Sequence, residues 1–401
     1  MAHQNGLSEW TAQVSTNLPH LSKPQALGLA LWSYGIVMMR SCGRTTIATF
    51  FALLLGQKAA TLNQRLREWC YEAEAKAGVK SGAKKRQQLD VTSCFAPLLA
   101  WLVRLWHGRS LALAIDATTL DSRLSVLVVS VVSHSCAIPV AWTVLPQQRK
   151  GKWRSHWLRL LRLLRPAIPE GWTVLVLADR GLYAGWLFRR IKRLGWHPYL
   201  RARSDWQFRP DGKRNYYRLS SLVPDVGRHW AGTGTLFRTP SKQLRCTLLA
   251  YWGEGCEQPW CVLTDLPAEA AEVACYGLRS WCEQGFKVFK RGAWQWNSSR
   301  MSEPGRVERL WLALAVATLW MVSVGGALED ELESVGLPEL SELLLPAGKG
   351  RRRMRLLRLA LIWLMVCLLR GVRFPMPARL VPEPWPRRPQ WPQLPPLLEA
   401  E

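Results

Sequence analysis

Two aspartates directly follow apolar runs in this chain. Asp116 stands in LALAIDATT, and Asp179 stands in TVLVLADRGLY. Where neighbouring strands of a sheet run parallel, their carboxyl ends meet at one edge, and ligands bind there. A carboxylate at the end of a buried strand is costly unless it is solvated, paired or bound to a metal. The two positions together indicate a metal site, although an aspartate after a strand often only caps or turns the chain.

Four further residues of mixed chemistry recur at regular intervals. They are Tyr276, Arg279, Glu283 and Lys290, in YGLRSWCEQGFKVFK. At about 100° per residue in an α-helix, all four share an arc of about 60° on one face. A solvated face with an Arg279–Glu283 salt bridge is the simpler interpretation. That interpretation leaves Tyr276 unexplained and requires no upstream pair of aspartates.

The spacing resembles the signature of DDE-type transposases of insertion-sequence family 4, in which Tyr, Arg, Glu and Lys occur at the same intervals. The two aspartates lie in motifs that are similar to that family's two upstream Asp motifs. The matching positions are Asp116 with Thr118, and Asp179 with Gly181 and Tyr183. The four-residue signature is quite specific, whereas the Asp motifs are specific only in its company.

The resemblance covers roughly residues 44 to 325, with two departures. Ser280 follows the signature Arg where related members often carry an aromatic residue, and Cys282 and Gly285 flank Glu283 differently. Glycine weakens a helix interior by about 1 kcal/mol. These departures leave the three acids intact and bear on how a DNA end is held.

The resemblance implies a role for each acid. Asp116, Asp179 and Glu283 would bind two Mg²⁺ or Mn²⁺ ions, which prefer carboxylate oxygens. Such ions activate a water or a 3′-hydroxyl for attack and stabilise the leaving oxygen of an in-line displacement. The implied chemistry is therefore cleavage and joining of DNA strands.

The resemblance also implies DNA contacts. Tyr276, Arg279 and Lys290 would bind phosphates near the cleaved end, Arg279 in a bidentate manner. Trp260, in PWCVLTDLP, is similar to a family tryptophan that stacks on a flipped base. Base–aromatic stacking contributes about 1–3 kcal/mol. A core tryptophan is an equally good interpretation of Trp260, because the chain has 23 tryptophans.

The elements that must position these residues follow from hydrophobic patterning. Short runs rich in Val, Ile and Leu predict strands at 111–116, 124–133, 136–145, 173–178, 216–222, 233–238, 244–251 and 260–264. Helical patterns are expected at 153–164, 184–194, 268–290, 305–324 and 351–369. Three consecutive strands followed by alternating helix and strand are typical of a ribonuclease H-like core.

The predicted fold class is therefore α/β, with a ribonuclease H-like mixed sheet and a strand-rich insertion at about 205–258. This catalytic domain would span 109–328. An α-helical N-terminal domain at 1–108 would bind DNA, and a basic helical region with a Pro-rich tail would occupy 329–401. Candidate phosphate contacts in the N-terminal domain are Arg44, Arg65 and Arg67, with a basic run at Lys80–Arg86.

The charge of the chain favours a polyanionic partner. It has 54 Lys and Arg against 29 Asp and Glu, a formal net charge of +25. Phosphate binding releases counterions, so binding should weaken steeply with salt. An anionic membrane surface is the alternative to nucleic acid. Leu310–Leu328 is long and apolar enough to span a bilayer, but basic segments on both sides favour a buried core helix and no membrane.

The ten cysteines have no metal-binding spacing and predict reduced thiols in a cytoplasmic protein. The start of the chain has no signal-peptide pattern. The function expected from these features is a DNA transposase that cleaves transposon ends and transfers the strands to target DNA. The resemblance implies work as a homodimer in a synaptic complex. A metal-dependent nuclease and a DNA-binding protein without catalysis remain alternatives on the same fold.

Overall fold

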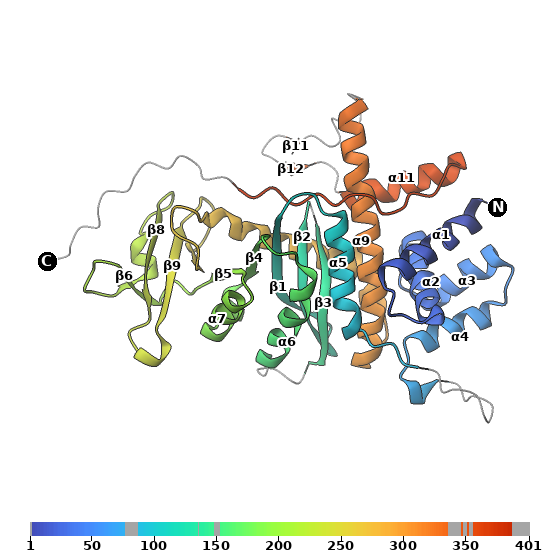
Figure 1. Cartoon of the computed structure of the whole chain (residues 1–401), viewed down its shortest axis with the longest axis horizontal. Coiled ribbons are helices and arrows are strands. Elements are labelled where there is room, and N and C mark those ends of the chain that lie inside the picture. Colours follow the sequence, from blue (N-terminus) through green and yellow to red (C-terminus); the bar gives the residue numbers. More distant parts are fainter. Residues whose placement is uncertain are drawn as a thin grey trace. The chain divides into compact units, whose positions relative to one another are not determined.

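The chain forms two compact units in the computed structural model (Figure 1). The first comprises Met1–Arg109, Ala117–Gly171 and Trp281–Glu383, and the second comprises Ser110–Asp116, Trp172–Ser280 and Pro384–Glu401. The described residues are 2–76, 87–134, 136–147, 153–335, 346–347, 351–352 and 356–386. The basic run Lys80–Arg86 lies outside them.

Helices dominate the first unit. They are α1 (Ala2–Asn17), α2 (Lys23–Met39), α3 (Arg44–Leu55), α4 (Ala59–Trp69), α5 (Phe95–Leu105), α6 (Arg154–Leu164), α9 (Pro304–Val335) and α11 (Leu356–Arg370). The segment expected to form a separate N-terminal domain packs on α9: the rings of Trp10 and Trp320 stack with centroids 3.9 Å apart. The units therefore cut across the three consecutive segments expected from the sequence.

Helix α9 forms the core of the first unit. Within the described part of the chain it is the one helix long and apolar enough to cross a membrane, and 94% of its apolar window is buried. Trp311 and Trp320 are fully buried in it. The prediction of a core helix at Leu310–Leu328 is confirmed, and α9 extends to Val335.

Strands β2 (Leu124–Ser133) and β3 (Cys136–Pro146) of the first unit pair antiparallel, from Leu124↔Pro146 to Ser133↔Cys136. All residues of β2 are buried, which fits its nearly continuous apolar sequence. On β3, the indole of Trp142 donates a hydrogen bond of 3.1 Å to the Glu308 carbonyl of α9. This contact fixes the strand pair against the core helix.

Strand β1 (Ser110–Leu120) passes from the second unit into the first after Asp116. The further strands are β4 (Thr173–Ala178), β5 (His197–Arg201), β6 (Gln207–Pro210), β7 (Tyr217–Arg218), β8 (His229–Leu236), β9 (Leu244–Tyr251) and β10 (Trp260–Thr264).

In the second unit the strand order is β1-β4-β5-β10-β9-β8-β6-β7, and in the first it is β3-β2-β1. Strands β4 and β5 run parallel to β1, with α7 (Gly185–Arg193) between them in the chain. The prediction of an α/β fold with a mixed sheet is confirmed.

Several details of the strand prediction were wrong. The strand expected at 111–116 extends to Leu120, and the strand expected at 233–238 spans His229–Leu236. Strands β5 and β6 were missed, and the strand expected at 216–222 is limited to Tyr217–Arg218. A 3-10 helix follows at Leu219–Leu222, with both leucines buried. Their spacing of three residues puts them on one face of a 3-10 helix, so burial is satisfied without a strand.

The C-terminal helix begins later than expected. Residues Arg351–Arg352 form strand β12, which pairs with β11 at Pro346–Ala347, and α11 begins at Leu356. The segment from Phe374 was expected to lack regular structure, and its described part forms only isolated bridges, Trp106↔Leu380 and Ser133↔Pro382.

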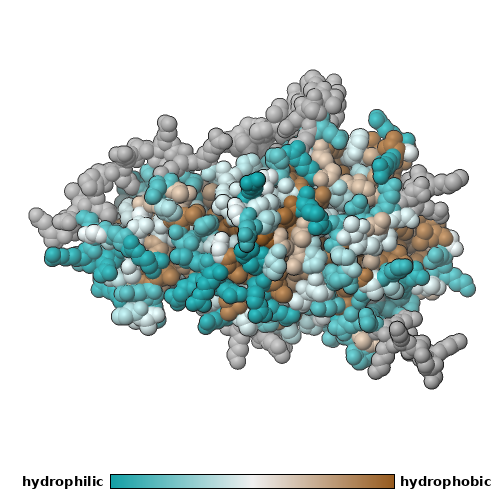
Figure 2. Space-filling model, in the orientation of Figure 1, coloured by the Kyte–Doolittle hydropathy of each residue, from teal (hydrophilic) through white to brown (hydrophobic). Residues whose placement is uncertain are grey.

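The surface carries many polar and charged residues, as the 21% of charged residues in the sequence predicts. Figure 2 shows hydrophilic residues over much of the visible face, with apolar patches between them. Exposed apolar side chains include Ile362, Met365 and Leu369 on α11.

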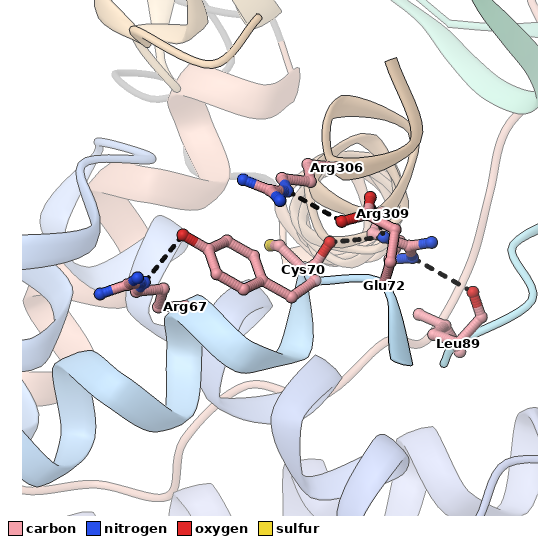
Figure 3. A network of polar contacts seen from close by, with 7 residues as sticks. Arg67, Cys70, Glu72, Leu89, Arg306 and Arg309 are labelled. Carbon is pink, nitrogen blue, oxygen red and sulfur yellow. Dashed lines mark hydrogen bonds and ion pairs between the residues drawn. The ribbon is translucent and has the colours of Figure 1, made fainter. Parts of the chain in front are cut away.

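A polar network joins the end of α4 to the start of α9 within the first unit (Figure 3). The Arg309 side chain is 4% exposed. Its Nη1 donates to the Cys70 carbonyl at 2.6 Å and to Glu72 Oε1 at 3.2 Å, and its Nε donates to the Leu89 carbonyl at 3.3 Å. Arg306 Nε donates to Glu72 Oε2 at 3.0 Å. Burial acts to raise the pKa of Glu72, but a backbone hydrogen bond and the two arginines outweigh it and lower that pKa.

Candidate active site

The register of two parallel strands brings the predicted aspartates to the same level. Strand β1 pairs with β4 from Ser110↔Thr173 to Ile115↔Ala178. Asp116 and Asp179 are the next residues after this paired run. Since neighbouring strands lie about 4.8 Å apart, the register places both aspartates together where the pairing ends. Asp179 follows β4 as predicted, but Asp116 does not end its strand, because β1 continues to Leu120.

Arg279 links the two carboxylates. Its Nη2 donates to Asp116 Oδ2 at 2.8 Å and lies 4.0 Å from Asp179 Oδ2. The side chains of Asp116 and Arg279 are 16% and 15% exposed, whereas that of Asp179 is 38% exposed. One guanidinium between two carboxylates leaves a formal charge of −1 in a mostly buried place, where charge interactions are stronger than in bulk water.

Tyr276 completes this group. Its hydroxyl donates to Asp179 Oδ1 at 3.2 Å, and its side chain is buried. Burial, followed by the charge of Asp179, raises the pKa of Tyr276. The hydroxyl therefore keeps its proton at neutral pH and acts as a donor.

Trp260 lies against Tyr276 at the start of β10. The two rings meet edge to face, with centroids 5.2 Å apart and an interplanar angle of 78°. Trp260 is partly exposed. This intermediate burial fits neither a fully buried core tryptophan nor a fully exposed one. The role in base stacking stays a prediction.

The single helix expected at 268–290 was wrong. Val273–Arg279 is a 3-10 helix, Ser280–Lys287 is the α-helix α8, and Val288–Gly292 is a π-helix. The shared arc of about 60° assumed 3.6 residues per turn throughout, and therefore does not hold. In a 3-10 helix, residues three apart eclipse one another. That geometry explains why Tyr276 and Arg279 both reach the aspartate pair.

Glu283 and Lys290 belong to the first unit, where they line a pocket of about 410 Å³. The other lining residues are Thr118, Phe286, Lys287 and Arg291. Three cations against one carboxylate give the pocket a formal charge of +2, which suits a phosphate. Burial and the neighbouring Arg291 lower the pKa of Lys290. Lys287 and Arg291 were missed from the sequence, although both were visible beside Lys290 in KVFKR.

Gly285 packs closely against strand β3, a contact that the sequence around it did not predict. A Cβ at this position would lie 2.6 Å from the carbonyl oxygen of Ala137 on β3. Glycine thus allows α8 to approach the strand at the level of Glu283. The helix-weakening residue noted in the sequence is the one that permits close packing.

We expect Gly285→Ala to lower the free energy of unfolding by about 1–3 kcal/mol, because backbone atoms must move to accept the added carbon. Urea unfolding measures this effect. Gly181→Ala is the matched control, since a Cβ at Gly181 would meet no atom within 4 Å. Equal stability of the two variants would contradict the packing argument.

The remaining predicted contacts lie on the N-terminal helices. Arg44 begins α3, and Arg65 and Arg67 lie on α4. Arg65 is exposed and lines a cavity of about 950 Å³. Arg67 is exposed and donates from Nε to the Tyr71 hydroxyl at 2.8 Å. Their DNA-binding role stays a prediction.

The donor chemistry of the aspartate pair fits a divalent cation. Asp116 and Asp179 already direct oxygens at one cationic group, Arg279, and carboxylate oxygens are what Mg²⁺ and Mn²⁺ prefer. Over the residues that the structure describes, no three or more His, Cys, Asp or Glu side chains are grouped so as to hold a metal ion. The pair is thus the acidic core of the candidate site, and the participation of Glu283 stays a prediction.

Comparison with known proteins identifies the class. The family model described as "Transposase DDE domain" matches residues 107–320, more than half of the chain. The chain therefore belongs to the transposase DDE domain family. No curated protein matches it.

Among solved structures, the chain is similar to a piggyBac transposase, seen by cryo-electron microscopy in a synaptic complex with hairpin DNA. The two sequences are 11% identical, and the TM-score is 0.43. The similarity covers 92% of this chain and 79% of that chain.

Proposed function

We propose that this transposase cleaves the ends of its own element and joins them to target DNA, with Asp116, Asp179 and Glu283 as the catalytic acids. The observation that carries the proposal is the aspartate pair at the end of the β1–β4 pairing, within the matched family region. The Tyr, Arg, Glu and Lys spacing further supports membership of insertion-sequence family 4. Cut-and-paste transposition is the function that these features support best.

The three acids would hold two Mg²⁺ or Mn²⁺ ions, and such ions supply an activated nucleophile and a stabilised leaving oxygen in phosphoryl transfer. Arg279 and Tyr276 of the second unit bear directly on this site, because they orient Asp116 and Asp179. The basic pocket of Lys287, Lys290 and Arg291 offers charge for the DNA backbone.

Double-stranded DNA is the proposed partner, both as element ends and as target. The formal charge of +25 supports it. We further propose that two protomers hold two ends in a synaptic complex in the cytoplasm. Sedimentation of the protein with and without end DNA tests the dimer: two chains per complex is the expected result.

The test of the function uses the DNA that flanks the coding region. The purified chain is incubated with labelled element ends, a target plasmid, and Mg²⁺ or a chelator. We expect nicking at the ends and joined products that require the metal. Cleavage without joining would identify a nuclease, and binding without cleavage would identify a DNA-binding protein that lacks catalysis.

A further inference from the structure

Two arginines that lie far apart in the sequence flank one tyrosine in the first unit. The guanidinium carbon of Arg306 lies 3.9 Å from the centroid of the Tyr71 ring, and that of Arg67 lies 5.1 Å from it. Figure 3 labels both arginines in the polar network at the end of α4. Such cation–π contacts hold a guanidinium in a fixed position.

Each arginine is also oriented through its Nε. Arg67 Nε donates to the Tyr71 hydroxyl at 2.8 Å, and Arg306 Nε donates to Glu72 Oε2 at 3.0 Å. Within the described part of the chain, the Nη groups of Arg67 and Arg306 have no hydrogen-bond partner. Both side chains therefore present the forked end that binds phosphate oxygens bidentately.

The local charge is not balanced. Among the described residues, Glu72 is the carboxylate that forms ion pairs with Arg306 and Arg309, so the three arginines Arg67, Arg306 and Arg309 with Glu72 carry a formal charge of +2. Arg44 lies in the same neighbourhood, because its charge acts on the buried Cys70 thiol together with those of Arg309 and Arg306. An excess of oriented cations on a partly exposed surface favours a polyanion.

We propose that Arg67 and Arg306, oriented by Tyr71 and Glu72, form a binding site for the backbone phosphates of duplex DNA. This site rests on the proposed function and extends it, since Arg306 and Tyr71 come from segments that no sequence pattern joins. Arg309 has a supporting role: its hydrogen bonds to Cys70, Glu72 and Leu89 hold the scaffold and leave it no part in DNA contact.

The test measures how the affinity of the full chain for a short duplex of arbitrary sequence depends on salt. We expect Arg67→Gln and Arg306→Gln each to reduce the slope of log K against log salt by about 0.9. Arg306→Lys keeps the charge and should keep the slope. Arg373→Gln is the matched control, because the Nη2 of this exposed arginine already lies 3.5 Å from Glu9.

The outcomes separate this site from the proposed function. Duplex binding with an unchanged slope in both glutamine variants would overturn the phosphate site and leave the transposase proposal standing. No binding of duplex by the wild-type chain would overturn both. If Arg306→Gln unfolds, Arg67→Gln decides alone, because Arg67 is exposed and both its side-chain hydrogen bond and its cation–π contact are with Tyr71.

Discussion

Asp116→Asn and Asp179→Asn are each expected to reduce end cleavage by roughly 10²–10³-fold. The reason is that asparagine keeps the size of the side chain but lacks the negative charge that a divalent cation requires. Metal-ion catalysis contributes several kcal/mol, and each 1.36 kcal/mol is about tenfold in rate. The measurement is single-turnover nicking of labelled element ends in Mg²⁺.

The control for this prediction is Asp225→Asn, the same chemical change at a carboxylate of the second unit whose side chain is 70% exposed. It should cleave like the wild type. All three variants should bind end DNA, because the aspartates repel rather than attract phosphates. Wild-type cleavage by either Asp116→Asn or Asp179→Asn would remove the pair from the catalytic site.

The same nicking measurement tests Glu283. We expect Glu283→Gln to lose cleavage to the same extent, whereas Glu303→Gln, an exposed glutamate of the same unit, should retain it. Full activity of Glu283→Gln would show that the third acid lies elsewhere in the chain. The pair of Asp116 and Asp179 would then stand without it.

Arg309→Met is expected to lower the free energy of unfolding by roughly 3 kcal/mol. Removing one partner of a buried ion pair is strongly destabilising, and a buried acceptor without a donor costs about 1–3 kcal/mol. Methionine fills much of the volume but leaves the carbonyls of Cys70 and Leu89 without this donor and leaves Glu72 with Arg306 alone. The partial exposure of Glu72, 34%, keeps the effect below the sum of these contributions.

Urea unfolding, followed by circular dichroism, measures the change. Arg373→Met is the control, since its ion pair with Glu9 is exposed and such pairs contribute little. Unfolding of both Arg309→Met and Arg373→Met at the urea concentration of the wild type would contradict a stabilising role of Arg309.

The elements that the sequence predicted well are those with strong local patterns. Strands β2, β4, β9 and β10 begin and end at the predicted residues. Each is a run of apolar residues bounded by turn residues, so the information lies within the segment itself. Strand β5 was missed because HPYLR contains a proline and two basic residues, and its burial depends on the parallel pairing with β4.

The helix from 273 to 292 shows the opposite case. Its spacing of Tyr, Arg, Glu and Lys was correct as a motif, but the change from 3-10 to α to π geometry was not visible. These changes alter the number of residues per turn, and tertiary packing routinely overrides local propensity. Gly285 against the Ala137 carbonyl is one such packing contact.

The sequence by itself determined the class of the protein, the positions of the two aspartates and the net positive charge of the chain, because residue types, spacing and net charge are properties of the chain. Tertiary structure alone decided which residues meet. The β1–β4 register brings Asp116 to Asp179 across 63 residues, and Arg279 reaches both from the 3-10 helix Val273–Arg279. Tyr71 meets Arg306 in the same way. Such contacts depend on how strands pair and helices pack, which no local pattern records.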